Sequence, residues 1–234
     1  MAGSIRNNNS AHGGNNTVSS LNIDTYTVGL WLMFFADSYE NLPVYQYVFK
    51  SVCWAYGQEV GINSDANSLF FTDSGDTVIA TGGSTSWYYL TWKKVGLNIV
   101  VKYRPVESQS WNTLVIYDVD FDADLEYVSV FESGFPFAVS PYNAAVRSVR
   151  MWNIERDDTE MLEESNSRVP VNETNKVLSA ADGNNPDPTE PNWNDPAISS
   201  TIILTTGGTA VYYPDDPITD EEAPVPSMFF GMCA

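Results

Sequence analysis

The stretch that decides the fold is VRSVRMWN at residues 146–153, which runs directly into IERDDTEMLEE at residues 154–164. The first half predicts a β-strand, because its residues alternate between two faces with the period of a pleated ribbon. Val149 falls on one face, and Arg150 and Trp152 fall on the other. Met151 falls on the same face as Val149, so that this face of the strand is apolar.

The second half of this stretch predicts a short surface helix. Asp157 can cap the first turn, and Glu160, three residues later, completes an acidic version of the capping box. Met161 and Leu162 then give the helix a small apolar side that can rest on a sheet. The expected unit is therefore a strand, a corner and one short capped helix.

The composition limits the classes of partner. With 11 Lys plus Arg against 30 Asp plus Glu, the 234-residue chain has a formal net charge of -19. This charge disfavours nucleic acid and anionic membranes as partners and suits divalent cations. No segment approaches the ~18 consecutive apolar residues of a transmembrane helix. The two cysteines, Cys53 and Cys233, make no disulfide framework, although a bridge between them stays open.

Several segments resemble laminin-G-like, concanavalin A-type jelly rolls. The run TYTVGLWLMFF at residues 25–35 is similar to the family's early F-T-I-x-F-W strand, with Trp31 at the aromatic position. WYYLT at 87–91 and NIVVKY at 98–103 are similar to its W-H-H-V-A strand and the L-x-L-Y-V-D-G partner. Two tyrosines replace the histidine pair, and Arg-Pro replaces the Asp-Gly turn. The stretch at 146–164 matches the family's closing strand and helix.

The resemblance and the spacing of short strands together predict an all-β fold. We expect a two-sheet antiparallel jelly-roll sandwich, concanavalin A-like, with one short helix near 157–165. Residues 1–20 predict a flexible N-terminal arm or a strand added late, followed by a single domain over 21–234. That domain would include a Pro/Asn/Asp-rich surface excursion at 165–197 and a C-terminal hairpin plus tail at 200–234.

An acidic run at residues 118–126 is the candidate metal site. If the run is extended, alternate carboxylates lie on one face at a spacing of ~6.6 Å, twice the rise per residue. Such carboxylates repel one another unless water or a hard cation such as calcium separates them. A solvent-facing acidic strand without metal is the alternative. The predicted calcium ligands are Asp118, Asp120, Asp122 and Asp124.

Aromatic side chains are the candidate sugar-binding groups, because their flat faces can stack on a sugar ring and the chain has 7 Trp and 13 Tyr. Most of them are expected in the core, among them Trp31, Trp92 and Trp152. Those expected nearer the surface or in loops are the predicted ligand-binding residues. This set consists of Trp54, Trp111, Tyr142, Asn143 and Trp193.

The leading functional prediction is a non-enzymatic, lectin-like module that binds a glycan, with calcium as a candidate cofactor. A structural subunit is the first alternative: a virion decoration or fibre protein, or a homo-oligomer assembled through the arm or the C-terminal tail. A laminarinase-type glycoside hydrolase is the second, since Glu155 to Glu160 spells E-x-D-x-x-E. No signal peptide is recognised, which predicts a cytoplasmic, non-classically released or virion-associated protein without membrane insertion.

Overall fold

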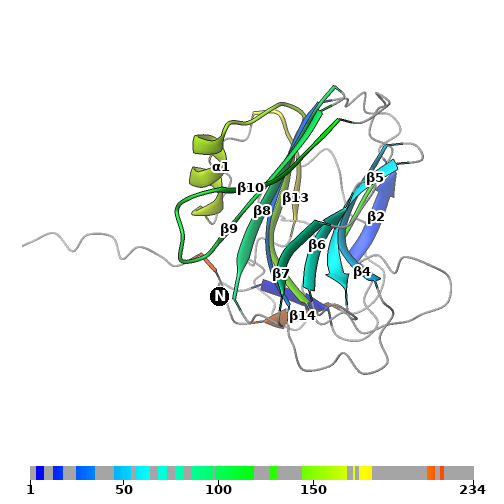
Figure 1. The fold of residues 1–234 in the computed structure, drawn as a ribbon. Helices are drawn as coiled ribbons and strands as arrows, with labels where there is room; N and C mark the ends of the chain where they lie inside the picture. The colour runs from blue at the N-terminus through cyan, green and yellow to red at the C-terminus, as the bar shows by residue number, and fades with distance from the viewer. Residues whose placement is uncertain are drawn as a thin grey trace, which may run out of the picture.

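Two antiparallel sheets lie face to face, and one short helix covers the outer face of the larger sheet (Figure 1). The computed structural model describes residues 4–7, 13–17, 25–34, 45–53, 56–63, 68–72, 77–81, 86–96, 98–118, 127–130, 144–167, 171, 174–180, 210–213 and 217–218. Side chains are described for 25–33, 86–96, 98–113, 145–167, 171, 174–180 and 217–218. Within these residues no helix is long and apolar enough to cross a membrane.

The larger sheet has eight strands, and its order differs from the order along the chain. Across the sheet the neighbours are β10 (Asn112–Asp118), β9 (Asn98–Pro105), β8 (Tyr88–Val95), β3 (Tyr26–Phe34), β12 (Ala144–Trp152), β1 (Ser4–Asn7) and β14 (Ala210–Tyr213). The eighth strand, β13 (Lys176–Ala180), pairs with the second half of β12. The early strand β3 and the late strand β12 therefore lie side by side.

The smaller sheet has six strands, in the order β2 (Gly13–Thr17), β11 (Tyr127–Val130), β4 (Tyr45–Cys53), β5 (Tyr56–Asn63), β6 (Ser68–Thr72) and β7 (Thr77–Thr81). From β4 to β7 each strand pairs with the next along the chain, so this part is a meander of hairpins. The predicted all-β, two-sheet antiparallel sandwich is confirmed.

The closing segment folds as the sequence predicts. The strand β12 leads through a short corner into helix α1 (Asp158–Ser165). Asp157 is the N-cap, its side chain accepts a hydrogen bond from the backbone N–H of Glu160, and the Glu160 carboxylate accepts one from the N–H of Asp157. Two backbone donors that the first helical turn leaves free are thus satisfied. Met161 is fully buried against the sheet.

A bulge in β12 sets which of its side chains lie under the helix. Arg147 pairs with Trp31 and Arg150 pairs with Gly29, so three steps on β12 match two steps on β3. Ser148, inside the bulge, has a φ of 51°, in the left-handed region. Because cross-strand partners share a face, the extra residue puts both arginines on the face that carries Trp31. The same place marks the change of β12's other neighbour from β1 to β13.

The face of the larger sheet that points to the smaller sheet is mostly apolar, although the buried Lys94 of β8, which pairs with Tyr26, also lies on it. On β3 it carries Tyr26, Val28, Leu30 and Leu32, all fully buried. Trp92 of β8, Val101 of β9 and Met151 of β12 are also fully buried and continue this inner layer on the neighbouring strands. The predicted core positions of Trp31, Trp92 and Trp152 are confirmed by exposures of 1%, 0% and 0%.

The structure bears on two expectations about the organisation of the chain: at residues 1–20 it has strands, the alternative to a flexible arm, and at 165–197 it requires a correction. Within the predicted arm at 1–20, Ser4–Asn7 and Gly13–Thr17 form β1 and β2, one in each sheet. Main-chain hydrogen bonds make these pairings, so the polar composition gives little sign of them. Within the predicted excursion at 165–197, Lys176–Ala180 is the buried strand β13. Its five residues lack Pro, but the flanking sequence is rich in loop-forming residues, so the pattern of the whole segment predicts a loop. The predicted hairpin strand at 201–205 lies outside the described residues.

Candidate functional site

Only one of the predicted ligand-binding residues has a described side chain. Trp111, half-buried, lies just before β10 in the loop at 106–111 that joins β9 to β10. Trp54, Tyr142, Asn143 and Trp193 lie outside the described residues. The structure therefore tests neither their roles nor whether they come together.

The structure does not test the predicted calcium ligands either. Asp118 is the last residue of β10 and pairs with Asn98, but its side chain is not described. Asp120, Asp122 and Asp124 lie outside the described residues. Among the residues that are described, no group of three or more His, Cys, Asp or Glu could hold a metal ion. Calcium binding at this run stays a prediction.

Trp111 is fixed against α1 and the sheet. Its indole N–H donates a hydrogen bond to the backbone carbonyl of Asp158 at 3.1 Å. Its ring centroid lies 6.0 Å from that of Tyr89, with the two planes tilted by 52°. The side chain thus joins the β9–β10 loop to the first turn of the helix. An aromatic ring held in this way has a single orientation in which to meet a ligand.

Two amide side chains lie on the surface in the same loop as Trp111 and just after α1. The exposed Gln109 accepts a hydrogen bond through Oε1 from Nδ2 of Asn166, which follows α1, at 3.2 Å. We call Gln109, Trp111 and Asn166 the Trp111 surface. An aromatic ring beside amide donors and acceptors can stack on a sugar ring and hydrogen-bond its hydroxyls.

Beneath α1 lies a group of buried charges that the sequence did not predict as a unit. Arg150 of β12 forms an ion pair with Glu164 of the helix, and both side chains are fully buried. Arg156, at the corner, approaches Glu164 at 3.9 Å and Glu160 at 3.7 Å. The Glu164 carboxylate also accepts a hydrogen bond from the backbone N–H of Val171 at 3.0 Å. One buried carboxylate thus holds the sheet, the corner and the segment after the helix together.

Two of the buried guanidinium groups also stack on tryptophan rings. Arg104 lies 4.9 Å from the ring centroid of Trp31, and Arg156 lies 4.7 Å from that of Trp152. Arg104 donates hydrogen bonds to Ser165 Oγ at 2.6 Å and to Asn166 Oδ1 at 2.8 Å. Burial lowers the pKa of Arg104 below its usual value, and the nearby Tyr89 partly opposes the change. These contacts use the arginines to dock the helix on the sheet.

Tyr89 and Gly29 form the closest contact beneath the helix. Burial, helped by the charge of Glu164, raises the pKa of Tyr89 above its usual value, so the phenol stays neutral. Among the described residues its hydroxyl has no hydrogen-bond partner. A Cβ atom added at Gly29 would lie 2.2 Å from this hydroxyl and 2.7 Å from Cε of Met161. Glycine is therefore required here for close approach rather than for backbone freedom.

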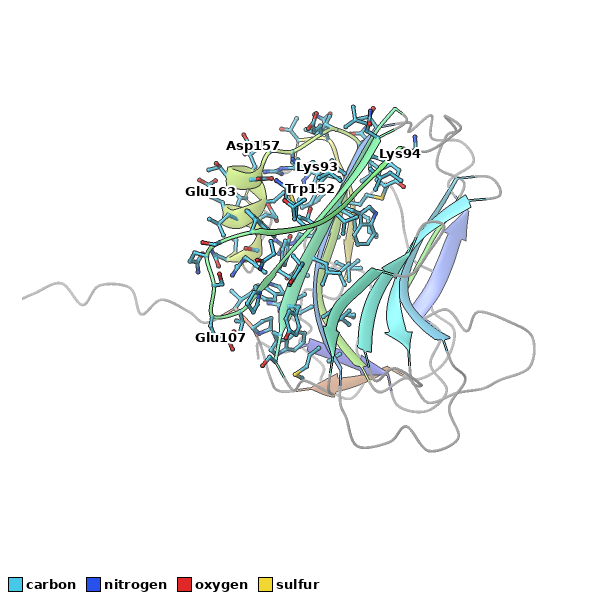
Figure 2. All side chains as sticks on the ribbon, in the orientation of Figure 1. Lys93, Lys94, Glu107, Trp152, Asp157 and Glu163 are labelled. Carbon is cyan, nitrogen blue, oxygen red and sulfur yellow. The ribbon has the colours of Figure 1, made fainter. Side chains whose placement is uncertain are left out.

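A second set of charges lies at the helix N-terminus and is partly exposed. Asp158 accepts a hydrogen bond from Lys102 Nζ at 2.5 Å and lies 3.6 Å from Lys93 Nζ. Figure 2 shows Lys93 on the side of the sheet that carries the helix, whereas Lys94, one residue on, lies on the opposite side. Partial burial by itself raises the pKa of Asp158, but the hydrogen bond and charge of Lys102, with Lys93, outweigh it and lower that pKa.

The E-x-D-x-x-E string has a structural use. Glu160 completes the capping box and lies 3.7 Å from Arg156. Glu155 is 59% exposed and lies 4.0 Å from Lys93, before the helix begins. The string spans a corner and a first helical turn, whereas the hydrolases that it resembles carry their acids along a strand in the sugar cleft.

The signal for the buried charges was present in the sequence but incomplete. The alternation in β12 puts Arg150 and Trp152 on one face, as predicted. Arg147 lies on that face only because of the bulge at Ser148, and a serine in the sequence does not predict a bulge. Glu164 was read as part of a surface helix, yet it lies on the side of α1 that faces the sheet.

Comparisons with known proteins give the fold but no family. No family model matches this chain, and the search of curated proteins found no match. Among solved structures, the chain is similar to a candidate carbohydrate-binding protein from Bacteroides ovatus ATCC 8483, with a TM-score of 0.63 and 12% identity. The similarity covers 93% of this chain and 62% of the other, so this chain spans less than two thirds of that protein. At this identity the likeness shows a common fold.

Two weaker similarities cover a smaller part of the chain. The sialidase of Trypanosoma rangeli matches with a TM-score of 0.44 and 11% identity, over 60% of this chain and 22% of the enzyme. A botulinum neurotoxin type C structure, reported with two ganglioside molecules as its route of cell entry, matches with a TM-score of 0.41 and 16% identity, over 59% of this chain and 34% of the toxin. Likeness at this level carries no argument about function.

Proposed function

We propose that this protein is a non-enzymatic carbohydrate-binding module built on a laminin-G-like, concanavalin A-type jelly roll. The observation that carries the proposal is the similarity of nearly the whole chain to the sandwich of the Bacteroides ovatus protein, which is named for carbohydrate binding. Because fold alone does not determine function, the local features of the chain have to support it too.

The strand order supports the choice of family. The resemblance involves an early strand, a Trp-containing strand with its partner, and a closing strand. These are β3, β8, β9 and β12, and they form four adjacent strands in the order β9-β8-β3-β12. The segments that carry the resemblance are far apart in the sequence and are adjacent in one sheet, which supports the proposed family.

The Trp111 surface supports binding. It offers one fixed aromatic ring and two exposed amide side chains, a combination by which proteins recognise uncharged hydroxylated rings. The absence of catalysis is part of the proposal: Glu160 is held by the helix cap, and Glu155 stands before it on the corner. Calcium is proposed only as an aid supplied by the acidic run at 118–126.

The test is a glycan array probed with the full chain, in calcium and again in EDTA. We expect binding to a defined set of oligosaccharides, with EDTA weakening it if the acidic run takes part. Trp111→Ala should reduce the affinity about tenfold or more, which corresponds to about 1.4 kcal/mol. Val171→Ala, at a 50% exposed position, is the control and should bind as the wild type does.

Because Trp111 also contacts the helix, the exposed Gln109 gives a second variant, Gln109→Ala, which removes one surface hydrogen bond with Asn166. A twofold or larger loss of affinity at unchanged thermal stability would support the Trp111 surface as the site. If the chain binds no neutral and no acidic sugar on the array, the proposed function is overturned. Release of reducing sugar from β-glucan, lost in Glu155→Gln, would overturn its non-enzymatic part.

A further inference from the structure

The cationic side chains that the structure describes are turned away from solvent. Eight of its 11 Lys and Arg residues have described side chains. Six of these eight are buried, namely Lys94, Arg104, Arg147, Arg150, Arg156 and Lys176. The side chains of the other two, Lys93 and Lys102, are 12% and 19% exposed, and both pair with Asp158. The remaining cations, Arg6, Lys50 and Arg168, have side chains outside the described residues.

The acidic side chains have the opposite distribution. Of the seven Asp and Glu residues with described side chains, Glu164 alone is buried. Figure 2 shows Glu107, Asp157 and Glu163 on the outer side of the β9–β10 loop and of α1. All three are exposed. In the described part of the chain eight cations stand against seven acids, yet the solvent-facing surface is acidic because most of those cations are buried.

We propose, on the basis of the proposed carbohydrate-binding function, that the ligand is an uncharged glycan and that the protein excludes sialylated and sulfated glycans. Proteins bind carboxylate and sulfate groups through guanidinium or ammonium donors, most strongly through a bidentate arginine. Here Arg104 is bonded to Ser165 and Asn166, and Arg150 and Arg156 are bound to Glu164. Using any of them for a ligand would dismantle the contact between helix and sheet.

The Trp111 surface also lacks a described cation that is available to bind an anionic sugar. Its polar groups are amides, which serve sugar hydroxyls as donors and acceptors and carry no charge. The nearest described cation is Arg104, which is buried and already donates hydrogen bonds to Asn166 Oδ1 and Ser165 Oγ. Exposed carboxylates near this surface, such as Glu107 and Glu163, would repel an anionic sugar over a distance of about one Debye length, ~30 Å at 0.01 M salt.

The experiment compares pairs of glycans that differ only in charge. Neutral cello-, manno- and N-acetyllactosamine oligosaccharides are measured beside the sialylated or sulfated derivative of each, at 10 mM and at 1 M sodium chloride. At low salt we expect the charged member of a bound pair to have about tenfold lower affinity than its neutral parent. At 1 M salt the Debye length falls to ~3 Å, so the gap should narrow to about threefold or less.

Charge reversal tests the cause of the exclusion. Glu107→Lys with Glu163→Lys adds 4 charge units to a formal charge of -19, giving -15, at two exposed positions without a described ion pair. It should raise the affinity for the charged glycan about threefold at low salt and leave the neutral parent unchanged. The matched control is Glu107→Gln with Glu163→Gln, which changes the charge by half as much and should give a smaller rise.

The outcomes separate the two proposals. Binding of the sialylated or sulfated member as tightly as its neutral parent at 10 mM salt would overturn the exclusion and leave carbohydrate binding standing. An equal gain for both members in the lysine variant would also overturn it, because charge would not be the cause. If no neutral or charged glycan binds, the proposed function fails and the inference fails with it.

Discussion

The two faces of strand β3 are both buried, but by different means. The inner face, toward the smaller sheet, carries Tyr26, Val28, Leu30 and Leu32, each with no exposed surface. The outer face, beneath α1, carries Thr27, Gly29, Trp31 and Met33. Next to these side chains stand Arg150 on β12 and Arg104 on β9, which docks on the ring of Trp31.

This difference teaches what each face depends on. Burial of apolar area is non-directional and tolerates exchange of one apolar residue for another of similar volume. A buried ion pair depends on geometry and on both partners being present. We therefore expect the inner face to respond to volume and the outer face to respond to single charges, contacts and pH.

The largest expected effect is at Glu164. Glu164→Gln removes the buried carboxylate that Arg150 and Arg156 contact and leaves their positive charge less compensated. The free energy of unfolding should fall by about 3–5 kcal/mol, the usual cost of breaking a buried ion pair from one side. Urea unfolding followed by tryptophan fluorescence measures it.

Glu163→Gln is the matched control, because Glu163 is the preceding residue of the same helix and is exposed. It should change the free energy by no more than about 0.5 kcal/mol. Equal losses in the two variants would break the comparison, since they would show that the outer face does not depend on its buried charge.

The second effect concerns the closest contact on the outer face. Gly29→Ala puts a methyl group 2.2 Å from the Tyr89 hydroxyl and 2.7 Å from Met161 Cε. Overpacking of this kind costs about 1–3 kcal/mol. In a Tyr89→Phe background the same substitution should cost less, because the nearest atom has been removed. A double-mutant cycle by thermal unfolding measures the coupling; strictly additive losses would contradict the contact.

The inner face was predictable from the sequence, and the reason is its simplicity. The apolar run at 25–35, and the alternation of Val149 and Met151 with Arg150 and Trp152, suffice to predict these two strands. The capping box at 157–160 was predictable for a similar reason, since both of its side chains act within one helical turn. Local patterns of this kind carry their own geometry.

The outer face was not predictable, because its geometry comes from distant parts of the chain. The bulge at Ser148 depends on how β12 changes neighbours from β1 to β13. Both of those strands lie in segments whose polar composition predicts an arm or a loop. For the candidate site, the sequence predicts Trp111 as a binding residue but does not predict its contact with α1. That contact is the hydrogen bond from Trp111 to Asp158, which lies 47 residues further along the chain.

The third effect tests how far the outer face depends on the helix itself. Asp157→Ala removes the N-cap side chain that accepts from the backbone N–H of Glu160. Loss of such a cap costs about 1 kcal/mol, so thermal unfolding should occur at a lower temperature. Thr159→Ala, at an exposed position in the same helical turn, should change stability by less than about 0.5 kcal/mol. If both variants unfold alike, the cap does not hold the helix.

The smallest expected effect is the pH dependence of the ion pairs of Asp158 on the outer face. Lys102 and Lys93 lower the pKa of Asp158, so the charged carboxylate stabilises the folded state. This contribution is fully present above the unfolded pKa of about 3.9 and is lost as the pH falls through the lower, folded pKa. Because Asp158 is 42% exposed, solvent screening keeps the contribution below about 1 kcal/mol.

Urea unfolding of wild type and Asp158→Asn at pH 7, 5 and 3 measures this difference, and Glu107→Gln serves as the exposed control. The wild type should be the more stable at pH 7 and 5, and the gap should narrow at pH 3, where protonation of Asp158 begins. It should also narrow at pH 7 in 1 M salt, because the Debye length falls to about 3 Å. A gap that stays constant with pH and salt would mean that Asp158 acts through packing, as the residues of the inner face do.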